Sequence, residues 1–209
     1  HTRYGTVTGV QTCALPIYKG GLKDEDGDSP DWIELRNTNS YTLSLANYAL
    51  TDNPTNRALW VFPNAKIPPN GYAIVFASGK DRRAANAQLH TNFKLDAKGD
   101  YLALIDRDGS TVLQQFPADY PASKKYPRQK DNVSYGADAA GKTGFMRPPT
   151  PMAANGTAYD GVVEDTSFSI DRGFYFTNFS LSITTLTASA SVRYTLDNSE
   201  PTASTGILY

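Results

Sequence analysis

The sequence predicts an all-β fold, and three observations lead to this prediction. The 209 residues include 13 Tyr, 9 Phe and 2 Trp, and aromatic side chains favour pleated strands over helices. Sixteen Gly and 13 Pro are spread along the chain, which indicates frequent turns. Residues 31–37 alternate, with Ile33 and Leu35 on one side and Trp32, Glu34 and Arg36 on the other. This period of two is typical of a strand with one side on a core and the other on solvent.

Further segments in the first 136 residues have the length and composition of short strands, bounded by turn residues. They are 42–50, with an irregularity near Ala46 and Asn47, then 58–63, 72–77, 92–95, 101–105, 111–116 and 132–135. Residues 72–77 are apolar on both faces, so we expect them at the centre of a sandwich. Asp108 and Gly109 predict a hairpin turn, because both residues tolerate positive φ.

Three further segments, one of them within the first 136 residues, have other compositions. Residues 80–89 are rich in helix formers but too few for a stable helix, so we predict a helical turn inside a long loop. Residues 137–165 are rich in Ala, Gly, Pro and Thr and are predicted to be a linker. Residues 166–209 form a second β unit with strands near 168–170, 179–184 and 192–196. About three strands rarely cover a core, so we expect part of a domain here.

The opening residues 1–18 fit no element well. Residues 7–17 resemble, residue for residue, the in-frame translation of a common sequencing-library adapter, and they lack the pattern of a signal peptide. We therefore expect residues 1–18 to be non-native or disordered; the alternative is a genuine but irregular N-terminal strand. Cys13, the only cysteine, lies in this run, so the remaining chain can form neither disulfides nor cysteine-based metal sites.

Several motifs in residues 19–136 occur in an order and spacing that match a known family. They are DEDGDSPDWIELRN at 24–37, YALTD at 48–52, WVFP at 60–63, PNGY at 69–72, HTNFKL at 90–95 and VSYG at 133–136. In these motifs the segment resembles a bacterial lamin-tail domain, which implies an immunoglobulin-like β-sandwich. The family has a first strand before the acidic turn, where this chain carries the adapter-like run. Without that strand, the sandwich would have an unpaired edge.

The second unit carries FS at 168–169, DRGFY at 171–175, VRYTLD at 192–197 and EPT at 200–202. It resembles the immunoglobulin-like domain at the C-terminus of chitobiase and β-hexosaminidase enzymes, of which only part is present. The tandem arrangement resembles large secreted or cell-surface proteins of environmental bacteria, in which a spore-coat-type protein kinase domain can follow. The resemblance therefore implies a location outside the cell or at its surface.

Charge and hydropathy narrow the classes of partner. Lys and Arg total 20 and Asp and Glu total 21, which gives a net charge of −1. This balance provides no excess positive charge to hold nucleic acid or an anionic membrane. No apolar run in the sequence approaches the ~20 residues that a transmembrane helix needs.

The acidic turn before the first clear strand is the candidate metal site. Asp24, Asp26, Asp28 and Asp31, with Gly27 allowing a sharp bend, could supply the hard oxygen ligands that Ca²⁺ prefers. Their spacing is not that of an EF-hand loop. Asp-Gly clusters also form ordinary turns, so the alternative is a turn without metal. Calcium is the only cofactor that the sequence suggests.

No catalytic residue and no cofactor-binding residue is predicted. His90 is the only histidine outside residues 1–18, and we expect it in a loop beside a strand. The chain contains no G-x-S-x-G, H-E-x-x-H or P-loop motif. Asp31 and Glu34 could be imagined as a glycosidase pair, but neighbouring carboxylates on a strand are more often solvated.

Two basic clusters and several aromatic residues could contact other molecules. The clusters are Lys80, Arg82 and Arg83, and Lys124, Lys125, Arg128 and Lys130. They could touch phosphates or anionic glycans, but isolated clusters in a neutral domain are usually solvated loops. Exposed Trp32, Tyr41, Trp60 or Tyr120 could stack on sugar rings, although we expect most of these in the core or at its rim.

The sequence therefore predicts two immunoglobulin-like modules, the second truncated, that form a non-catalytic binding or tethering part of a larger secreted bacterial protein. The expected partner is a glycan, a surface or another protein, and the oligomeric state is left open. One alternative is the accessory part of an enzyme, a spore-coat-type kinase or a hydrolase, whose catalytic domain lies beyond residue 209. Another is a lamin-type nucleic-acid-binding module, which the near-neutral charge and the lack of coiled-coil heptads disfavour.

Overall fold

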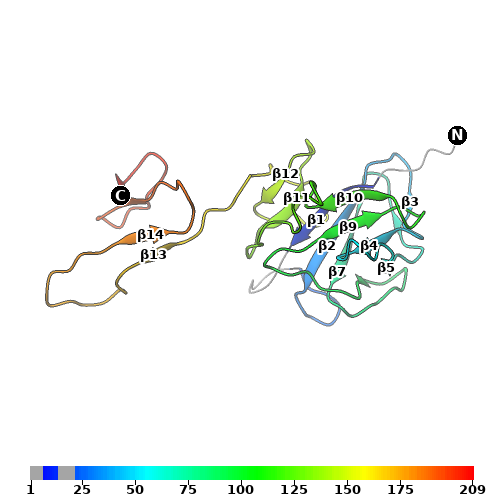
Figure 1. Ribbon diagram of the computed structural model, residues 1–209, viewed down its shortest axis with the longest axis horizontal. Coiled ribbons are helices and arrows are strands. Elements are labelled where there is room, and N and C mark those ends of the chain that lie inside the picture. The colour runs from blue at the N-terminus through cyan, green and yellow to red at the C-terminus, as the bar shows by residue number, and fades with distance from the viewer. Residues whose placement is uncertain (1–6, 14–21) are drawn as a thin grey trace. The chain divides into compact units, whose positions relative to one another are not determined.

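The computed structural model describes residues 7–13, as backbone only, and residues 22–209. The remaining positions of the predicted non-native segment 1–18 lie outside the described residues. The chain divides into a larger unit, His1–Gly161, and a smaller unit, Val162–Tyr209. The described residues form strands and no helix, which confirms the all-β prediction (Figure 1). Consequently, this part of the chain has no helix of the length and hydropathy needed to cross a membrane.

The larger unit is built on a six-stranded sheet. Its strands, in spatial order, are β12 (Thr143–Met146), β11 (Ser134–Ala137), β1 (Val7–Cys13), β2 (Asp31–Asn37), β7 (Tyr72–Ala77) and β8 (Leu89–His90). Every neighbouring pair is antiparallel except β7 and β8, which run parallel. The strand β7, predicted at the centre, lies between β2 and the short edge strand β8.

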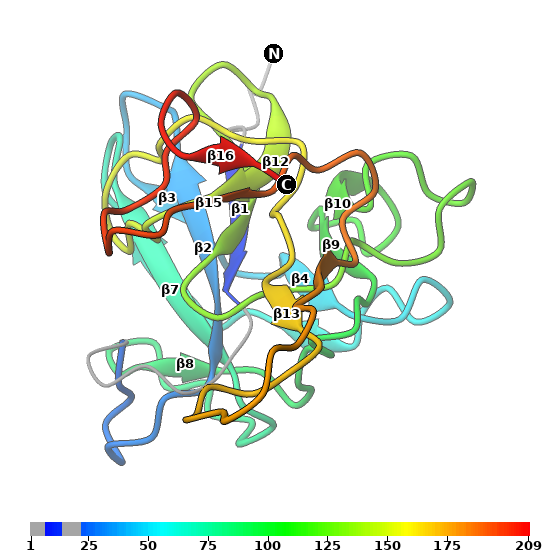
Figure 2. The same cartoon turned by 90° about the vertical axis from the view of Figure 1, so that its left-hand side faces the viewer.

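A second, four-stranded sheet faces the first. Its order is β10 (Val112–Phe116), β9 (Leu102–Ile105), β4 (Ala49–Thr51) and β5 (Trp60–Val61); a separate pair joins β3 (Leu43–Ser44) to β6 (Lys66–Ile67). Figure 2 separates the two sheets, with β2 and β7 on one side and β4, β9 and β10 on the other. Buried side chains of both sheets belong to one core cluster, which includes Ile33, Leu35, Val75, Leu50, Trp60, Leu102, Leu104 and Phe116. This is the predicted sandwich.

The strand β2 has the predicted bounds but not the predicted exposure. Ile33 and Leu35 are fully buried, as expected, but Trp32 and Glu34 on the other side are only 4% and 2% exposed. The segment after β12 reaches this side, where the backbone N–H of Met152 donates a hydrogen bond to Glu34. The expectation of a solvent-facing side was therefore wrong, because a distant segment covers it.

The larger unit has a strand before the acidic turn, at the position of the first strand of the lamin-tail family. Residues 7–13 form β1, in which Thr12 is opposite Ile33 of β2 on one side and Tyr135 of β11 on the other. The unpaired edge expected for this position is therefore absent from the described sheet. This arrangement corresponds to the alternative interpretation of these residues, a genuine strand.

The larger unit extends into residues 137–165, the range predicted as a linker. That range contains β12, whose Phe145 and Met146 are buried. Phe145 exchanges two 2.8 Å backbone hydrogen bonds with Tyr159, so a later segment lies along the outer edge of β12. A Cβ at Gly144 would come within 2.4 Å of the Tyr159 carbonyl oxygen, so this close approach requires glycine.

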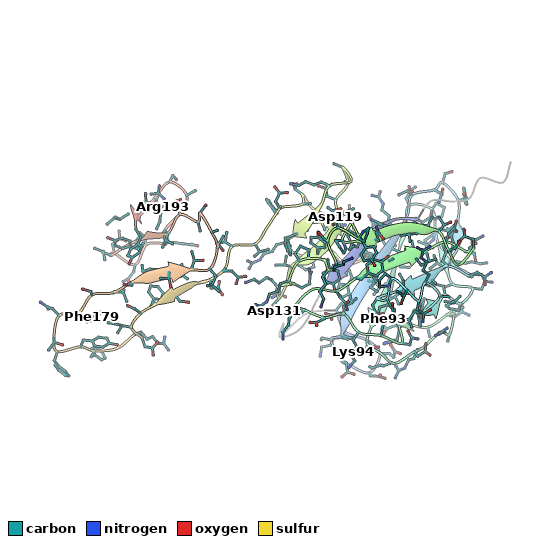
Figure 3. The ribbon with its side chains drawn as sticks, in the orientation of Figure 1. Phe93, Lys94, Asp119, Asp131, Phe179 and Arg193 are labelled. Atoms are coloured by element: carbon teal, nitrogen blue, oxygen red, sulfur yellow. The ribbon has the colours of Figure 1, made fainter. Side chains whose placement is uncertain are left out.

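The structure confirms the predicted hairpin but differs from the prediction for residues 92–95. Residues 80–89 contain one turn, closed by a 3.1 Å hydrogen bond from Ala87 N–H to the Ala84 carbonyl, and then enter β8. The segment 92–95 is not a strand; Lys94, labelled in Figure 3, makes only a single bridge to Ser78. The predicted hairpin is present, with Gly109 at φ +70 between β9 and β10.

The smaller unit has four short strands: β13 (Thr166–Phe168) pairs with β14 (Ile183–Thr185), and β15 (Arg193–Tyr194) pairs with β16 (Ile207–Leu208). None of residues 162–209 is buried. Phe174 and Phe176 are fully exposed. The ring of Phe179, labelled in Figure 3, packs on that of Tyr175, and their centroids are 4.6 Å apart. This unit has strands but no buried core.

Candidate functional site

The acidic turn is organised by one buried aspartate. The Oδ1 atom of Asp24 accepts the backbone N–H groups of Asp26 at 3.0 Å and Asp28 at 2.9 Å. The backbone of Asp24 is also bonded to Asp28 and Gly27, and Gly27 has a φ of +84. These bonds turn the chain so that carboxylate oxygens of Asp24, Asp26 and Asp28 lie within 4.8 Å of one another. Three of the four predicted calcium ligands therefore come together.

Lys80 lies among these three carboxylates. Its ammonium nitrogen is 2.5 Å from Asp24, 2.6 Å from Asp26 and 2.9 Å from Asp28. Because all three contacts are charge-assisted, the pKa of Lys80 is raised above its ordinary value. The pKa of Asp24 is raised by burial, but hydrogen bonds from Lys80 and from backbone N–H groups outweigh burial and lower it overall. A lysine ammonium thus occupies the place that a bound cation would take.

The fourth predicted ligand is elsewhere. Asp31 is buried at the start of β2, opposite Ala77 of β7, and does not belong to the group of three. A calcium ion at the turn would have three carboxylates instead of four and would have to compete with Lys80. Calcium binding stays a prediction.

Arg82 adds a second cation to the turn. Its guanidinium donates to Asp26 at 2.7 Å and also to Glu25. The hydrogen bonds from Arg82 and then Lys80 lower the pKa of Asp26 to about 2. The two cations Lys80 and Arg82 therefore offset part of the negative charge of the acidic turn.

His90 was expected in a loop, and this was wrong: it lies in β8 with no exposed surface. Its Nδ1 atom is 2.8 Å from Ser78 Oγ, and its Nε2 atom is 3.0 Å from Glu25 Oε2. The ring also stacks on Phe76, with centroids 5.2 Å apart. Hydrogen bonds from His90 and then Arg82 lower the pKa of Glu25 to about 2. No sequence pattern singled out Ser78 or Glu25 as partners of this histidine.

Serine, histidine and a carboxylate are the residue types of a nucleophilic triad. Such a triad can act only if a substrate can reach its side chains. The imidazole of His90 is fully buried and Ser78 is only 9% exposed. The Ser78 hydroxyl also accepts the backbone N–H of Lys80 at 3.2 Å. In such a triad the serine hydroxyl attacks the substrate carbonyl, and little of Ser78 is exposed to a substrate. The geometry instead ties β7, β8 and the acidic turn together.

Glu34, considered above with Asp31 as a glycosidase pair, is a buried carboxylate, as are Asp24 and Asp31. Burial raises its pKa to about 7, and the 2.5 Å hydrogen bond from Met152 offsets only part of that effect. Asp31 and Glu34 are three positions apart on one strand and therefore point to opposite faces of the sheet. They do not form the facing pair that glycoside hydrolysis requires.

The remaining candidates divide between core and surface. Trp32 and Trp60 are buried, Tyr120 packs on Tyr101, and Tyr41 is 46% exposed. In the first basic cluster, Arg83 pairs with Asp81 while Lys80 and Arg82 hold the acidic turn. In the second, Lys124, Lys125 and Arg128 are exposed.

Comparison with known families gives one match. The family model described as Lamin Tail Domain matches residues 18–116. This agrees with the immunoglobulin-like sandwich of the larger unit and with a non-catalytic module. Searches of curated proteins and of solved structures returned no match.

Proposed function

We propose that the chain is a non-catalytic binding or tethering module of a larger secreted or cell-surface bacterial protein. Its partner is a glycan, a surface or another protein, and the module holds the rest of that protein close to this partner. The match of residues 18–116 to the Lamin Tail Domain family supports a module of this kind.

One observation supports the proposal: His90 and Lys80, which could take part in chemistry, make contacts that stabilise the fold. His90 has no exposed surface, and its two ring nitrogens contact Ser78 and Glu25. Lys80 is enclosed by three carboxylates. Groups engaged in this way stabilise a loop arrangement and are not available to a substrate.

For residues 166–209 we propose a partial domain of the type found at the C-terminus of chitobiase and β-hexosaminidase enzymes. The motifs at 171–175 and 192–197 support this relationship. The lack of any buried residue in this unit is what a partial sandwich would show. Such domains accompany catalytic domains, so the proposal also includes a role as the accessory part of an enzyme.

A lamin-type nucleic-acid role is less well supported by the charges. All three cations in the first basic cluster are paired within the protein, Lys80 and Arg82 with the acidic turn and Arg83 with Asp81. In the second cluster, Lys124, Lys125 and Arg128 are exposed and could contact phosphates. Binding through these three cations alone would be weak, because most of the affinity for nucleic acid comes from the number of phosphates that are neutralised.

The test is a glycan-array screen of the full chain, run beside a DNA-binding titration at low and physiological salt. The proposal predicts glycan or protein-surface binding that persists at physiological salt. DNA binding that weakens steeply with salt, without any glycan or protein hit, would reverse the ranking of these functions.

A further inference from the structure

Exposed apolar side chains gather in the hairpin that joins β13 to β14. Phe174 and Phe176 are fully exposed, and four more side chains are between 43% and 57% exposed: Phe168, Tyr175, Phe179 and Leu181. We refer to these six side chains as the hairpin face. Soluble monomers rarely expose a contiguous apolar patch larger than a few hundred Å², and larger patches mark interaction sites. The hairpin face is therefore a candidate binding surface.

The hairpin face borders a hollow of about 900 Å³. Its lining includes Phe168, Tyr175, Phe179 and Leu181, so these four side chains lie together. Two contacts within the hairpin help to shape the hollow. The hydroxyl of Tyr175 donates to the carbonyl of Asp171 at 2.5 Å, and the centroids of the Tyr175 and Phe179 rings are 4.6 Å apart (Figure 3). These contacts give the face a defined surface for a partner.

The area of the hairpin face matches one side of a stable protein interface. A fully exposed aromatic side chain presents about 200 Å². At the exposures given above, the six side chains together present roughly 800 Å². A standard interface between proteins takes about 800 Å² from each partner. Since none of residues 162–209 is buried, the rest of this unit leaves the face uncovered.

The charges beside the face favour a second copy of the chain as the partner. Asp171 and Arg172 are exposed neighbours that line the hollow, and neither takes part in an ion pair within residues 22–209. In a two-fold interface, each contact between two residues occurs twice, with the copies exchanged. Asp171 of one copy can therefore pair with Arg172 of the other, twice in the same interface. The surface is thus complementary to itself in charge as well as in hydrophobicity.

We infer that the hairpin face joins two copies of this chain in a two-fold dimer. Each copy supplies the apolar layer that the smaller unit of the other copy lacks, and two-stranded sheets need such a layer for stability. The fully exposed rings of Phe174 and Phe176 pack against the hollow of the partner copy. The dimer forms at micromolar concentration, so the monomer in more dilute solution leaves the hollow open to a hydrophobic dye. The inference goes beyond the proposed function, which a monomer could also perform.

The experiment measures the mass of the full chain by sedimentation velocity, from nanomolar to high micromolar concentration. Phe176→Ser removes a fully exposed ring from the face. Asp171→Arg and Arg172→Asp each place like charges opposite one another in the dimer, and the double variant restores opposite charges. Glu200→Arg is the matched control, because it reverses an exposed charge of the same unit outside the hollow. Fluorescence of a hydrophobic dye is recorded for the same samples.

We expect the wild type to change from monomer to dimer as its concentration rises, with the dye bound per chain falling over the same range. Phe176→Ser should raise the dissociation constant about tenfold. Each single charge reversal should raise it by a similar factor, because like charges then face each other. The double reversal should restore the wild-type dissociation constant, and Glu200→Arg should leave it unchanged.

The substituted side chains are all exposed, so circular dichroism should show every variant folded like the wild type. Any of four results would overturn the inference. The chain could stay monomeric at every concentration, or it could associate beyond a dimer. Phe176→Ser or the single charge reversals could dimerise as well as the wild type, or the double reversal could fail to restore the dimer. None of these results bears on the tethering role, which the glycan and DNA assays test separately.

Discussion

The carboxylate of Glu34 accepts a 2.5 Å hydrogen bond from the backbone N–H of Met152, 118 residues later in the chain. This bond links the middle of β2 to the segment that follows β12. Glu34 is 2% exposed, so the bond forms away from bulk water. It makes the segment after β12 part of the sandwich and gives the domain a buried acid that titrates near neutral pH.

The pKa of Glu34 predicts how stability depends on pH. Burial raises this pKa from 4.5 to about 7, so the folded protein holds the proton more tightly than the unfolded chain. The stabilisation is complete below about pH 4.5 and is lost as pH rises through 7, with an upper limit of about 3 kcal/mol. Glu34→Gln keeps an acceptor for Met152 and removes the titration. Urea unfolding between pH 5 and 8 should therefore give a flatter profile for Glu34→Gln.

The control for this experiment is Asp131→Asn, because Asp131 is exposed (Figure 3). Its pH profile should follow that of the wild type. Asp52 and Asp100 also have pKa values raised by burial, so part of the wild-type slope remains in Glu34→Gln. Identical slopes for Glu34→Gln and the wild type would show that Glu34 does not titrate in this range.

Lys80 predicts how the acidic turn responds to calcium. In the wild type the ammonium is bonded to Asp24, Asp26 and Asp28, so calcium must displace it. Lys80→Met leaves three converging carboxylates without this cation, and we expect a lower unfolding midpoint in the absence of metal. Millimolar calcium should then raise the midpoint of Lys80→Met more than that of the wild type. Differential scanning fluorimetry with calcium, and with magnesium as the control, measures both shifts.

Replacement of His90 should lower the stability of the domain, and we expect no catalytic activity that depends on this histidine. His90→Ala removes a fully buried ring and leaves Ser78 and Glu25 without their shared partner. We expect the free energy of unfolding to fall by roughly 2–4 kcal/mol. Ser78→Ala removes only one hydroxyl and should cost about 1 kcal/mol. Neither the wild type nor Ser78→Ala should hydrolyse an activated ester faster than free imidazole; a wild-type rate that Ser78→Ala abolishes would identify a hydrolase.

The extent of the first domain can be tested by truncation. A fragment ending at residue 161 keeps β12, whose Phe145 and Met146 are 6% and 1% exposed. A fragment ending at residue 136 loses these side chains and the partner of Glu34. Burial of the two side chains alone contributes about 4 kcal/mol, so the shorter fragment should unfold at much lower urea. Equal midpoints for the two fragments would show that residues 137–161 act as a linker.

The smaller unit should behave differently from the larger one. Apolar residues of this unit, together with Asp171 and Arg172, line a hollow of about 900 Å³, and none of its residues is buried. We expect fast amide exchange across 162–209 and binding of a hydrophobic dye, because few buried contacts oppose local opening. A fragment ending at residue 161 should lose the dye signal. Slow exchange in 162–209 would show that this unit has a stable core.

Local pattern was enough to predict some elements and not others. The alternation over Asp31–Asn37 gave the bounds of β2, and Asp108-Gly109 gave the hairpin, because each depends on neighbouring residues. The composition of residues 137–165 resembles a linker, so β12 was missed. Its strand character comes from pairing with β11 and Tyr159 and not from its own residue types.

In the candidate site, too, the sequence predicted the local features but not those that depend on distant segments. The clustering of Asp24, Asp26 and Asp28 follows from a short turn and was predicted. The insertion of Lys80 was not predicted, because it depends on how a loop more than 50 residues later lies against that turn. The burial of His90 depends likewise on the packing of β8 against Phe76 and Glu25.

The glycine at position 144 allows the segment around Tyr159 to lie against the outer edge of β12. A methyl group there would meet the carbonyl oxygen of Tyr159 at 2.4 Å and push that tail segment away from β12. Four residues of sheet would then lie open, and molecules could join side to side through them. We therefore expect Gly144→Ala to favour association between copies of the chain through β12.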